Sequence, residues 1–287
     1  MKKLYSRGVL ISFLLLVFAL TGCAAPKVIF PPIGNDATKS TTPGKFVWFD
    51  LFSTDTTTCE KFYKTLFGWD FKRTNESNAH VKTIFLQNKP IGNMIGGKVT
   101  QGNSQWLSYI STEDVDTTLN MAANNGGSIY REGKDMPNRG HVGVAIDPQG
   151  APFAVLTSFN GDPAEAELKP NMWLGAELWT SDAKEAARFY QIIAGYDVQL
   201  VGLHKKVEYR ILKTNGKRRG GIVNIPWKNT DPEWIPFIAV EDVATMMGKV
   251  ASLGGKIIIA PDMSVKEGRL AIIADPSGAM FGIHQIK

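Results

Sequence analysis

An internal repeat is the feature of the sequence that most restricts the possible folds. Asp55, Phe62-Tyr63 and Gly68 recur 127 positions later, at Asp182, Phe189-Tyr190 and Gly195. A second group recurs 128 positions later: Trp106, Glu113-Asp114-Val115, Gly126-Gly127 and the turn Asp147-Pro148-Gln149-Gly150 have counterparts beginning at Trp234, Glu241, Gly254 and Asp275. Self-similarity at a fixed offset indicates a duplicated structural unit. We therefore predict two tandem domains, 46–159 and 172–287, joined by a linker over 160–171.

Each copy is itself doubled. Hydrophobic patterning predicts a strand over 46–53, a helix over 55–67 and three further strands, and the same order begins again at residue 106. Each domain is therefore expected to contain two βαβββ units, and the fold class is α+β. On the first helix Cys59 takes the place that Ala186 holds in the second copy, on the apolar face, so we interpret Cys59 as a core residue and not as a nucleophile.

With this order of elements the chain resembles the vicinal oxygen chelate superfamily, the group of glyoxalase I, bleomycin-resistance proteins and extradiol dioxygenases. The resemblance rests on Asp55 with Phe62-Tyr63 after the first strand, on Asp114-Val115, and on the turn that begins at Asp147. It covers both expected domains and implies that each forms a half-open eight-stranded barrel. Because one fold hosts several chemistries, the resemblance assigns no activity by itself.

Members of this superfamily hold a divalent metal in the barrel with His, Gln or Glu side chains. At three of the four implied positions in each domain this chain has residues without a suitable donor: Trp48, Leu107 and Ala154, then Gly175, Ile235 and Gly282. The fourth position falls near residues 93–95 and 222–224 and offers at most one amide ligand. A catalytic metal needs about three protein ligands. We therefore expect no bound metal and no other cofactor.

The same positions predict which side chains line the barrels, because residues two apart on a strand face the same side of the sheet. The candidate ligand-binding residues are Trp48, Asp50, Tyr109, Glu177, Trp179, Phe237 and His284. Aromatic walls with one carboxylate per domain are typical of small-molecule sites. The alternative is that the aromatic residues only fill the barrels and that the carboxylates accept structural hydrogen bonds. The other histidines, His80, His141 and His204, have no metal-binding spacing.

The amino end has the pattern of an export signal. Lys2, Lys3 and Arg7 precede an apolar run over 9–20 that is shorter than the roughly 20 residues needed to span a bilayer. The run ends in Leu20-Thr21-Gly22-Cys23, which resembles the lipobox of bacterial lipoproteins. We therefore expect cleavage after residue 22, acylation of Cys23, and a location in the bacterial cell envelope, at the outer membrane facing the periplasm. Residues 23–45 are predicted to be a flexible tether.

Charge and cysteine content agree with this interpretation. Lys and Arg number 32 against 27 Asp and Glu, and loss of the three leader cations leaves 29 against 27, too small an excess for a surface that binds nucleic acid. With Cys23 acylated, only Cys59 would remain, so we expect no intramolecular disulfide.

The function that these observations favour is a membrane-anchored, metal-free lipoprotein whose barrels bind a small apolar or aromatic molecule. Whether the two domains pair within one chain is left open by the sequence. We lean against an enzyme. One alternative is a lactoylglutathione lyase-like lyase or isomerase that holds a metal with Asp50, Glu177 and His284. Another is a structural or protein-binding role at the envelope.

Overall fold

The structure is a computed structural model that describes residues 30–33, 40–74, 80–97, 104–202, 208–227 and 230–286. The expected leader, Cys23 and His204 lie outside these residues. Within the described ranges, no helix combines the length and the apolar character that a membrane crossing requires.

In its described residues, the first repeat contains eight strands and two helices. Its first module consists of β1 (Phe46–Ser53), α2 (Thr56–Phe67), β2 (Asp70–Arg73), β3 (Val81–Leu86) and β4 (Lys89–Gly96). Its second module consists of β5 (Gln105–Ser111), α3 (Val115–Asn124), β6 (Ser128–Met136), β7 (Gly140–Ile146) and β8 (Pro152–Ser158). Both have the expected βαβββ order.

The second repeat has the same order of strands and helices. Its modules are β9 (Trp173–Thr180), α4 (Ala183–Ala194), β10 (Asp197–Gly202), β11 (Glu208–Thr214) and β12 (Lys217–Asn224), followed by β13 (Glu233–Val240), α5 (Val243–Val250), β14 (Lys256–Ile259), β15 (Leu270–Ala274) and β16 (Met280–Gln285). Two short 3₁₀ turns, η2 (Ala251–Leu253) and η3 (Lys266–Gly268), flank β14.

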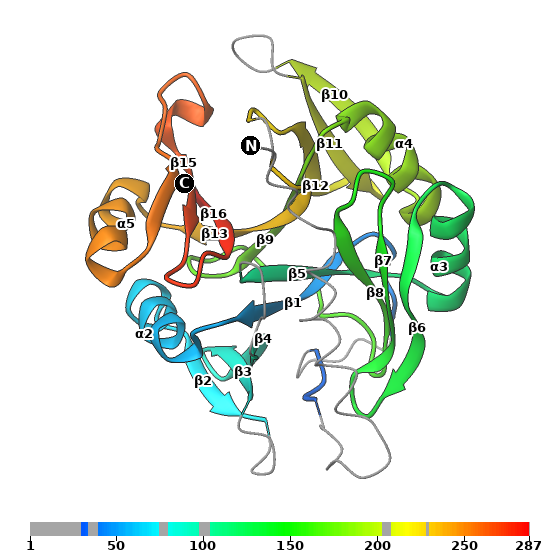
Figure 1. Cartoon of the computed structure of the whole chain (residues 1–287), viewed down its shortest axis with the longest axis horizontal. Helices are drawn as coiled ribbons and strands as arrows, with labels where there is room; N and C mark the ends of the chain where they lie inside the picture. The colour runs from blue at the N-terminus through cyan, green and yellow to red at the C-terminus, as the bar shows by residue number, and fades with distance from the viewer. Residues whose placement is uncertain are drawn as a thin grey trace, which may run out of the picture.

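Each repeat forms one eight-stranded mixed sheet, in the orders β2-β3-β4-β1-β5-β8-β7-β6 and β10-β11-β12-β9-β13-β16-β15-β14. The first strands of the two modules pair antiparallel at the centre, β1 with β5 and β9 with β13. Neither sheet closes on itself, because its outer strands do not pair with each other. We call the concave sides the first and the second barrel (Figure 1). The α+β fold with two tandem half-open barrels is confirmed.

The aspartates of the repeat begin the helices. Asp55 accepts a hydrogen bond from the backbone N of Thr58, and Asp114 accepts one from Thr117. Asp182 and Asp242 cap α4 and α5 in the same way. Such side chains satisfy N–H groups that have no partner within the helix. Part of the repeated sequence pattern therefore specifies where each helix starts.

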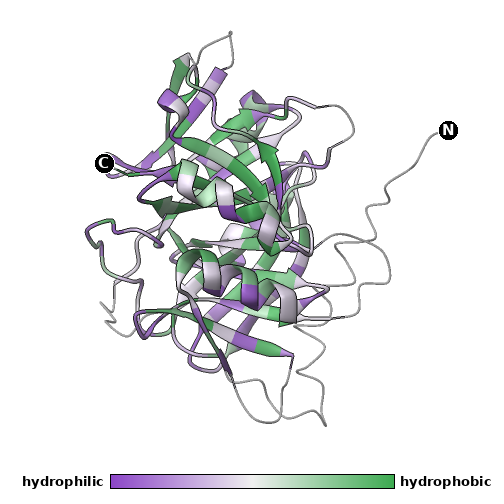
Figure 2. Ribbon diagram, turned by 90° about the vertical axis from the view of Figure 1, so that its left-hand side faces the viewer, coloured by the Kyte–Doolittle hydropathy of each residue, from purple (hydrophilic) through white to green (hydrophobic). Residues whose placement is uncertain are grey.

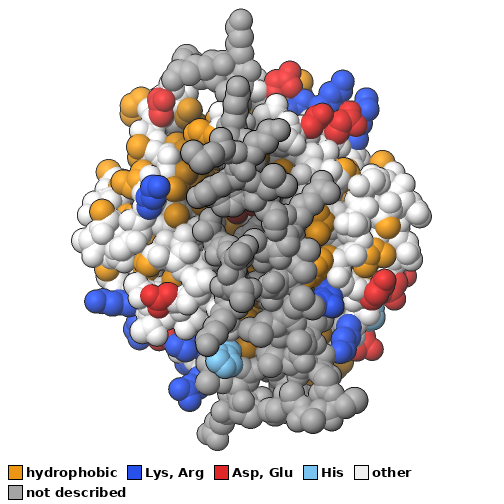
Figure 3. Space-filling view, in the orientation of Figure 1, with side chains coloured by type: hydrophobic (Ala, Val, Ile, Leu, Met, Phe, Trp, Pro, Cys, Tyr) orange, Lys and Arg blue, Asp and Glu red, His pale blue; other side chains and the backbone are white. Residues whose placement is uncertain are grey.

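The helices pack on the convex sides of the sheets, and across the repeats α2 lies beside α5 and α3 beside α4 (Figure 1). One buried hydrophobic cluster runs through this contact and contains residues from both repeats, such as Phe62, Tyr63, Phe189 and Phe281. Cys59 belongs to it and is fully buried, and burial raises the pKa of its thiol to about 12, so it is a core residue. Hydrophobic residues concentrate on the strands (Figure 2), and acidic and basic side chains are interspersed on the visible surface (Figure 3).

Two tyrosines connect the repeats reciprocally. The hydroxyl of Tyr63 on α2 donates to Asp275 Oδ2 at 3.0 Å and accepts from Trp106 Nε1 at 3.1 Å. In the mirrored arrangement, the hydroxyl of Tyr190 on α4 donates to Asp147 Oδ2 at 3.2 Å and accepts from Trp234 Nε1 at 2.8 Å. Burial raises the pKa of both carboxyl groups, while these and other hydrogen bonds lower it. The Phe-Tyr pairs, tryptophans and Asp-Pro turns of the repeat thus meet at one interface.

We predict that Tyr63→Phe and Tyr190→Phe each lower the free energy of unfolding by about 2 kcal/mol, because each removes the donor to a buried carboxylate and the acceptor of a buried indole N–H. Both substitutions should shift one common transition in urea denaturation, since the core is shared. Thr65→Ala on the exposed face of α2 is the control and should change stability by less than about 0.5 kcal/mol. Two separate transitions, with Tyr63→Phe affecting only one, would contradict this prediction.

Candidate functional site

The first barrel is filled with side chains. A second hydrophobic cluster occupies its concave side, and its buried members are Phe30, Ile33, Val47, Trp48, Phe52, Val81, Ile95, Leu107, Tyr109, Met136, Val142, Val144, Ala154 and Leu156. Trp48 and Tyr109, two of the candidate residues, face each other on β1 and β5 as register partners. Both side chains point into the barrel, as the alternation of side chains along a strand predicts, and both pack within the buried cluster.

Asp50 lies in this cluster with only 2% of its surface exposed. Its carboxylate accepts hydrogen bonds from Trp48 Nε1 at 2.7 Å, Asn93 Nδ2 at 2.9 Å and the Tyr109 hydroxyl at 2.6 Å. Burial raises the pKa of Asp50, while the charge of Arg139 and these three hydrogen bonds oppose that shift. Side chains from three strands thus hold the inward carboxylate. This arrangement agrees with the alternative in which Asp50 accepts structural hydrogen bonds.

Arg139 is the partner that the sequence analysis missed. Its guanidinium lies 4.0 Å from the ring centroid of Trp48 and 5.5 Å from that of Phe30, and the residue is 2% exposed. Its Nε and Nη2 have no hydrogen-bond partner among the residues that the structure describes. Arg139 sits in the turn between β6 and β7, where no strand periodicity indicates an inward direction.

The segment that precedes the first strand corrects one expectation. Phe30 and Ile33 belong to the range expected to be a tether, yet they are 2% and 4% exposed and pack inside the first barrel. Further along, Asp162 accepts hydrogen bonds from Thr42 N and from the Ser111 hydroxyl, both at 2.6 Å. Burial of two large apolar side chains outweighs the extended, solvated state that the polar composition suggested.

We predict that Phe30→Ala lowers the free energy of unfolding by about 3 kcal/mol, because it removes a buried aromatic ring and leaves a cavity beside Arg139. Urea denaturation of the whole chain measures the change. Phe159→Ala is the matched control, since Phe159 is 69% exposed and should contribute less than about 0.5 kcal/mol. Equal stability of Phe30→Ala and the unmodified protein would show that residue 30 does not pack in the barrel.

The second barrel is more polar and less filled. Its cluster has four buried members, Trp179, Ile235, Phe237 and Ile272, and a larger set that is only partly buried: Leu174, Val223, Ile225, Ile258, Ile259, Leu270 and Met280. Trp179 stacks on Trp227 with ring centroids 5.5 Å apart, and Trp227 is 41% exposed. The buried Trp179 Nε1 has no hydrogen-bond partner within the described part of the chain. This barrel is therefore lined by a buried indole with an unpaired N–H among the described residues and by the exposed ring of Trp227.

Glu177 occupies the position that Asp50 holds in the first barrel. Its carboxylate accepts hydrogen bonds from the Tyr209 hydroxyl and from Arg218 Nη2, the latter at 3.1 Å, and Arg218 Nη2 also lies 2.6 Å from that hydroxyl. Burial raises the pKa of Glu177, and Tyr209, Arg218 and Lys266 oppose the shift. Each barrel thus combines a carboxylate, a tyrosine and an arginine, but the tyrosine and the arginine come from different places in the fold: from β5 and the β6–β7 turn in the first barrel, and from β11 and β12 in the second.

Two glycines make room for this arrangement. A Cβ atom at Gly221 would collide with the hydroxyl of Tyr209, and one at Gly282 would collide with the ring of Phe237. Gly282 and Phe237 are register partners on β16 and β13. His284 lies two residues further along β16, on the same side of the strand. Burial first, then the charges of Lys266, Arg218 and Arg269, lower the pKa of His284 to about 4.

Comparisons with known proteins agree with this architecture. No protein-family model matches the chain. CFP32 of Mycobacterium bovis, which carries a glyoxylase name, is 27% identical over 241 residues, and the match covers 82% of this chain and 92% of that protein. DnrV of Streptomyces peucetius, named as an anthracycline biosynthesis protein, is 27% identical over 268 residues, covering 85% and 94%.

Solved structures resemble the chain in fold. The Mn(II)-bound glyoxalase from Novosphingobium aromaticivorans has a TM-score of 0.59 at 14% identity, covering 85% of this chain and 83% of that one. Homoprotocatechuate 2,3-dioxygenase from Arthrobacter globiformis has a TM-score of 0.58 at 12% identity, covering 90% and 83%. The tandem vicinal oxygen chelate fold is confirmed. The two half-open barrels of this chain therefore share the fold of these glyoxalase and dioxygenase structures.

The metal that vicinal oxygen chelate enzymes carry does not fit either domain. In the first domain, Trp48, Leu107 and Ala154 are buried members of the apolar cluster. In the second, the ring of Phe237 occupies the space that a side chain at Gly282 would need. Within the described ranges, no three His, Cys, Asp or Glu side chains come close enough to hold a metal ion. The residues at these positions lack the donors that a divalent cation requires.

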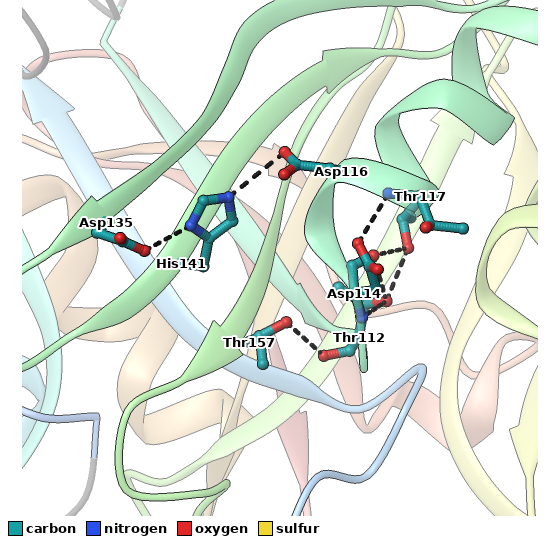
Figure 4. A network of polar contacts seen from close by, with 8 residues as sticks. Thr112, Asp114, Asp116, Thr117, Asp135, His141 and Thr157 are labelled. Carbon is teal, nitrogen blue, oxygen red and sulfur yellow. Dashed lines mark hydrogen bonds and ion pairs between the residues drawn. The ribbon is translucent and has the colours of Figure 1, made fainter.

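A cavity of about 340 Å³ lies outside both barrels, between the start of α3 and the end of α4. Its polar lining has structural roles: Asp114 caps α3, and the Thr157 hydroxyl donates to Thr112 O at 2.9 Å (Figure 4). Nearby, His141 Nδ1 lies 2.6 Å from Asp135 Oδ1 and His141 Nε2 lies 3.4 Å from Asp116 Oδ1 (Figure 4). The hydrogen bond with Asp135 is the largest cause of the raised pKa of His141.

This network predicts a pH dependence. Because the pKa of His141 is higher in the folded than in the unfolded chain, its stabilising contribution is complete below the unfolded value of about 6.5 and is lost as pH rises through the folded value. Asp135→Asn should lower the pKa of His141, as followed by NMR titration of its ring protons. Asp70→Asn, at the opposite edge of the same sheet, is the control and should leave the titration unchanged. An unaltered titration in Asp135→Asn would contradict the assignment of the shift.

Proposed function

We propose that the chain is a lipoprotein of the bacterial envelope whose second barrel binds a small aromatic or apolar molecule without a metal. The observation that carries the proposal is the contrast between the two barrels. The first is filled by its own side chains and by Phe30 and Ile33, whereas most apolar residues of the second are only partly buried, and its buried Trp179 stacks on Trp227, which is 41% exposed. Apolar walls with a few convergent polar groups are typical of sites for small organic molecules.

The roles of the candidate residues follow from this contrast. In the second barrel, Trp179 and Phe237 would contact the ligand ring, while Glu177 and His284 would contribute polar contacts. In the first barrel, Trp48, Asp50 and Tyr109 would instead stabilise the domain, because their mutual hydrogen bonds use the groups that a ligand would need. The relative DnrV is named as an anthracycline biosynthesis protein, and because anthracyclines are planar aromatic molecules, this name supports a planar ligand class.

Membrane attachment is the second part of the proposal. It rests on Leu20-Thr21-Gly22-Cys23 at the end of the apolar run and on the short polar stretch that follows. Several acyl chains on Cys23 would hold the domains at the membrane, since each buried methylene contributes about 0.8 kcal/mol. Mass spectrometry of the protein from bacterial membranes tests this part, and an amino terminus without acyl chains would contradict it.

The alternative function, a metal-dependent lyase or isomerase, requires Asp50, Glu177 and His284 to lie close enough to bind one metal ion. Asp50 belongs to the first sheet, whereas Glu177 and His284 belong to the second, so these residues do not form one site. Glu177 is already hydrogen-bonded to Tyr209 and Arg218. The low pKa of His284 leaves its imidazole neutral near pH 7, as a metal ligand would be, but the neighbouring cations oppose the binding of a further cation.

We predict that the neutral planar probe N-phenyl-1-naphthylamine binds with a micromolar dissociation constant, measured by its fluorescence, and that EDTA leaves this value unchanged. Trp179→Leu should weaken binding about tenfold, equivalent to about 1.4 kcal/mol, because it removes the stacking surface. Phe52→Leu is the matched control, since Phe52 is the counterpart of Trp179 in the filled barrel and its loss should leave the affinity within about twofold.

Two results would contradict this proposal. Near-stoichiometric zinc, nickel, iron or manganese in the purified protein would favour the metal-dependent lyase or isomerase. Absence of probe binding, or equal binding by Trp179→Leu and the unmodified protein, would favour a structural or protein-binding role.

A further inference from the structure

The second barrel carries more positive than negative charge around His284. The cations that act on His284 are Lys266, Arg218 and Arg269. The nearby carboxylates are Glu177, which is bonded to Arg218, and Glu267, which pairs with Arg269 at 3.0 Å. Lys266 is exposed and has no ion-pair partner among the residues that the structure describes. Among the described side chains, one positive charge at this end of the barrel is therefore not neutralised by an ion pair.

A strained turn presents this lysine. The consecutive residues Lys266, Glu267 and Gly268 have φ values of 51°, 56° and 72°. For Lys266 and Glu267, which have a Cβ, such left-handed backbone costs on the order of 1 kcal/mol or more each. The turn is fixed beside the barrel, because Arg269 O accepts from Gln285 N at 2.8 Å and Leu270 is the register partner of His284. Its position places Lys266 near both Glu177 and His284.

A third carboxyl group in the second barrel, that of Glu233, does not offset the excess of positive charge around His284. Glu233 is the register partner of Trp179 on β13, so the two side chains face the same side of the sheet. Burial, with a smaller effect of Asp231, raises the pKa of Glu233 to about 8, so this group is mostly protonated at pH 7. The wall thus combines the Trp179–Trp227 stack, the indole N–H of Trp179, which is unpaired within the described ranges, and an excess of cations around His284.

We propose that the ligand of the second barrel is a planar aromatic anion, whose ring lies against Trp179 and Trp227 and whose carboxylate, sulfonate or phosphate group binds Lys266 and Arg218. This inference rests on the proposed function, because it concerns the same site. The strained turn then has a functional explanation, since it holds a cation where an anionic substituent enters. A charge-assisted hydrogen bond to the ammonium group would add affinity that a neutral ligand cannot gain.

The test uses two probes with the same aromatic framework. 1-Anilinonaphthalene-8-sulfonate carries a sulfonate that the neutral N-phenyl-1-naphthylamine lacks, so the ratio of their affinities isolates the contribution of the anionic group. We expect Lys266→Met to lower the ratio of sulfonate-probe to neutral-probe affinity about tenfold, and Lys266→Glu to lower it further. The neutral probe should bind the Lys266 variants within about twofold of the unmodified protein. Lys249→Met, on the exposed side of α5, is the matched control and should leave the ratio unchanged.

The outcomes separate this inference from the proposed function. A ratio that Lys266→Met and Lys266→Glu both leave unchanged, while Trp179→Leu still weakens both probes, would overturn the anionic ligand class and keep the site. Failure of both probes to bind, or no effect of Trp179→Leu on either, would overturn the proposed function itself. Raising the salt concentration should weaken only the sulfonate probe, because salt screens an exposed ion pair. Equal weakening of both probes by salt would count against the inference.

Discussion

The buried contact between the two repeats determines most of what this chain can do. Each half-open sheet has an apolar convex side that must be covered, and the helices of both repeats cover it together. Within this contact, two buried aspartates, Asp147 and Asp275, each depend on a tyrosine hydroxyl from the other repeat. An unpartnered buried carboxylate is costly. The two domains therefore stabilise each other, and their concave sides remain the surfaces on which they can differ.

The two concave sides have diverged although they share an architecture. The first barrel is closed by a large apolar cluster in which Arg139 lies against Trp48 and Phe30. The second is lined by partly buried apolar residues and by charged groups near Glu177. A duplicated fold allows the two barrels to differ, because side chains can fill one barrel and stabilise its domain while the apolar residues of the other stay partly exposed. Similar divergence explains how one superfamily can host several chemistries.

Tight packing at several of the positions where vicinal oxygen chelate enzymes hold their metal leaves no room for a metal-binding side chain. A carboxylate or imidazole at position 282 would have to displace the ring of Phe237, and one at position 154 would have to enter the close-packed cluster of the first barrel. Tyr209 similarly reaches Glu177 only because residue 221 is glycine. Restoring a metal site would therefore require several coordinated changes, since close-packed interiors tolerate added volume poorly.

The sequence by itself determined the repeat, the βαβββ order and the strands that carry Asp50 and Glu177, because all of these depend on local periodicity and spacing. It also indicated the missing metal donors. Only the tertiary structure decided the partners: Arg139 approaches Trp48 from a turn, Tyr209 and Arg218 come from two further strands, and Phe30 enters the first barrel from outside the repeat. Such contacts join residues far apart in the chain, and the pattern around any one of them carries no signal of which distant side chain it will meet.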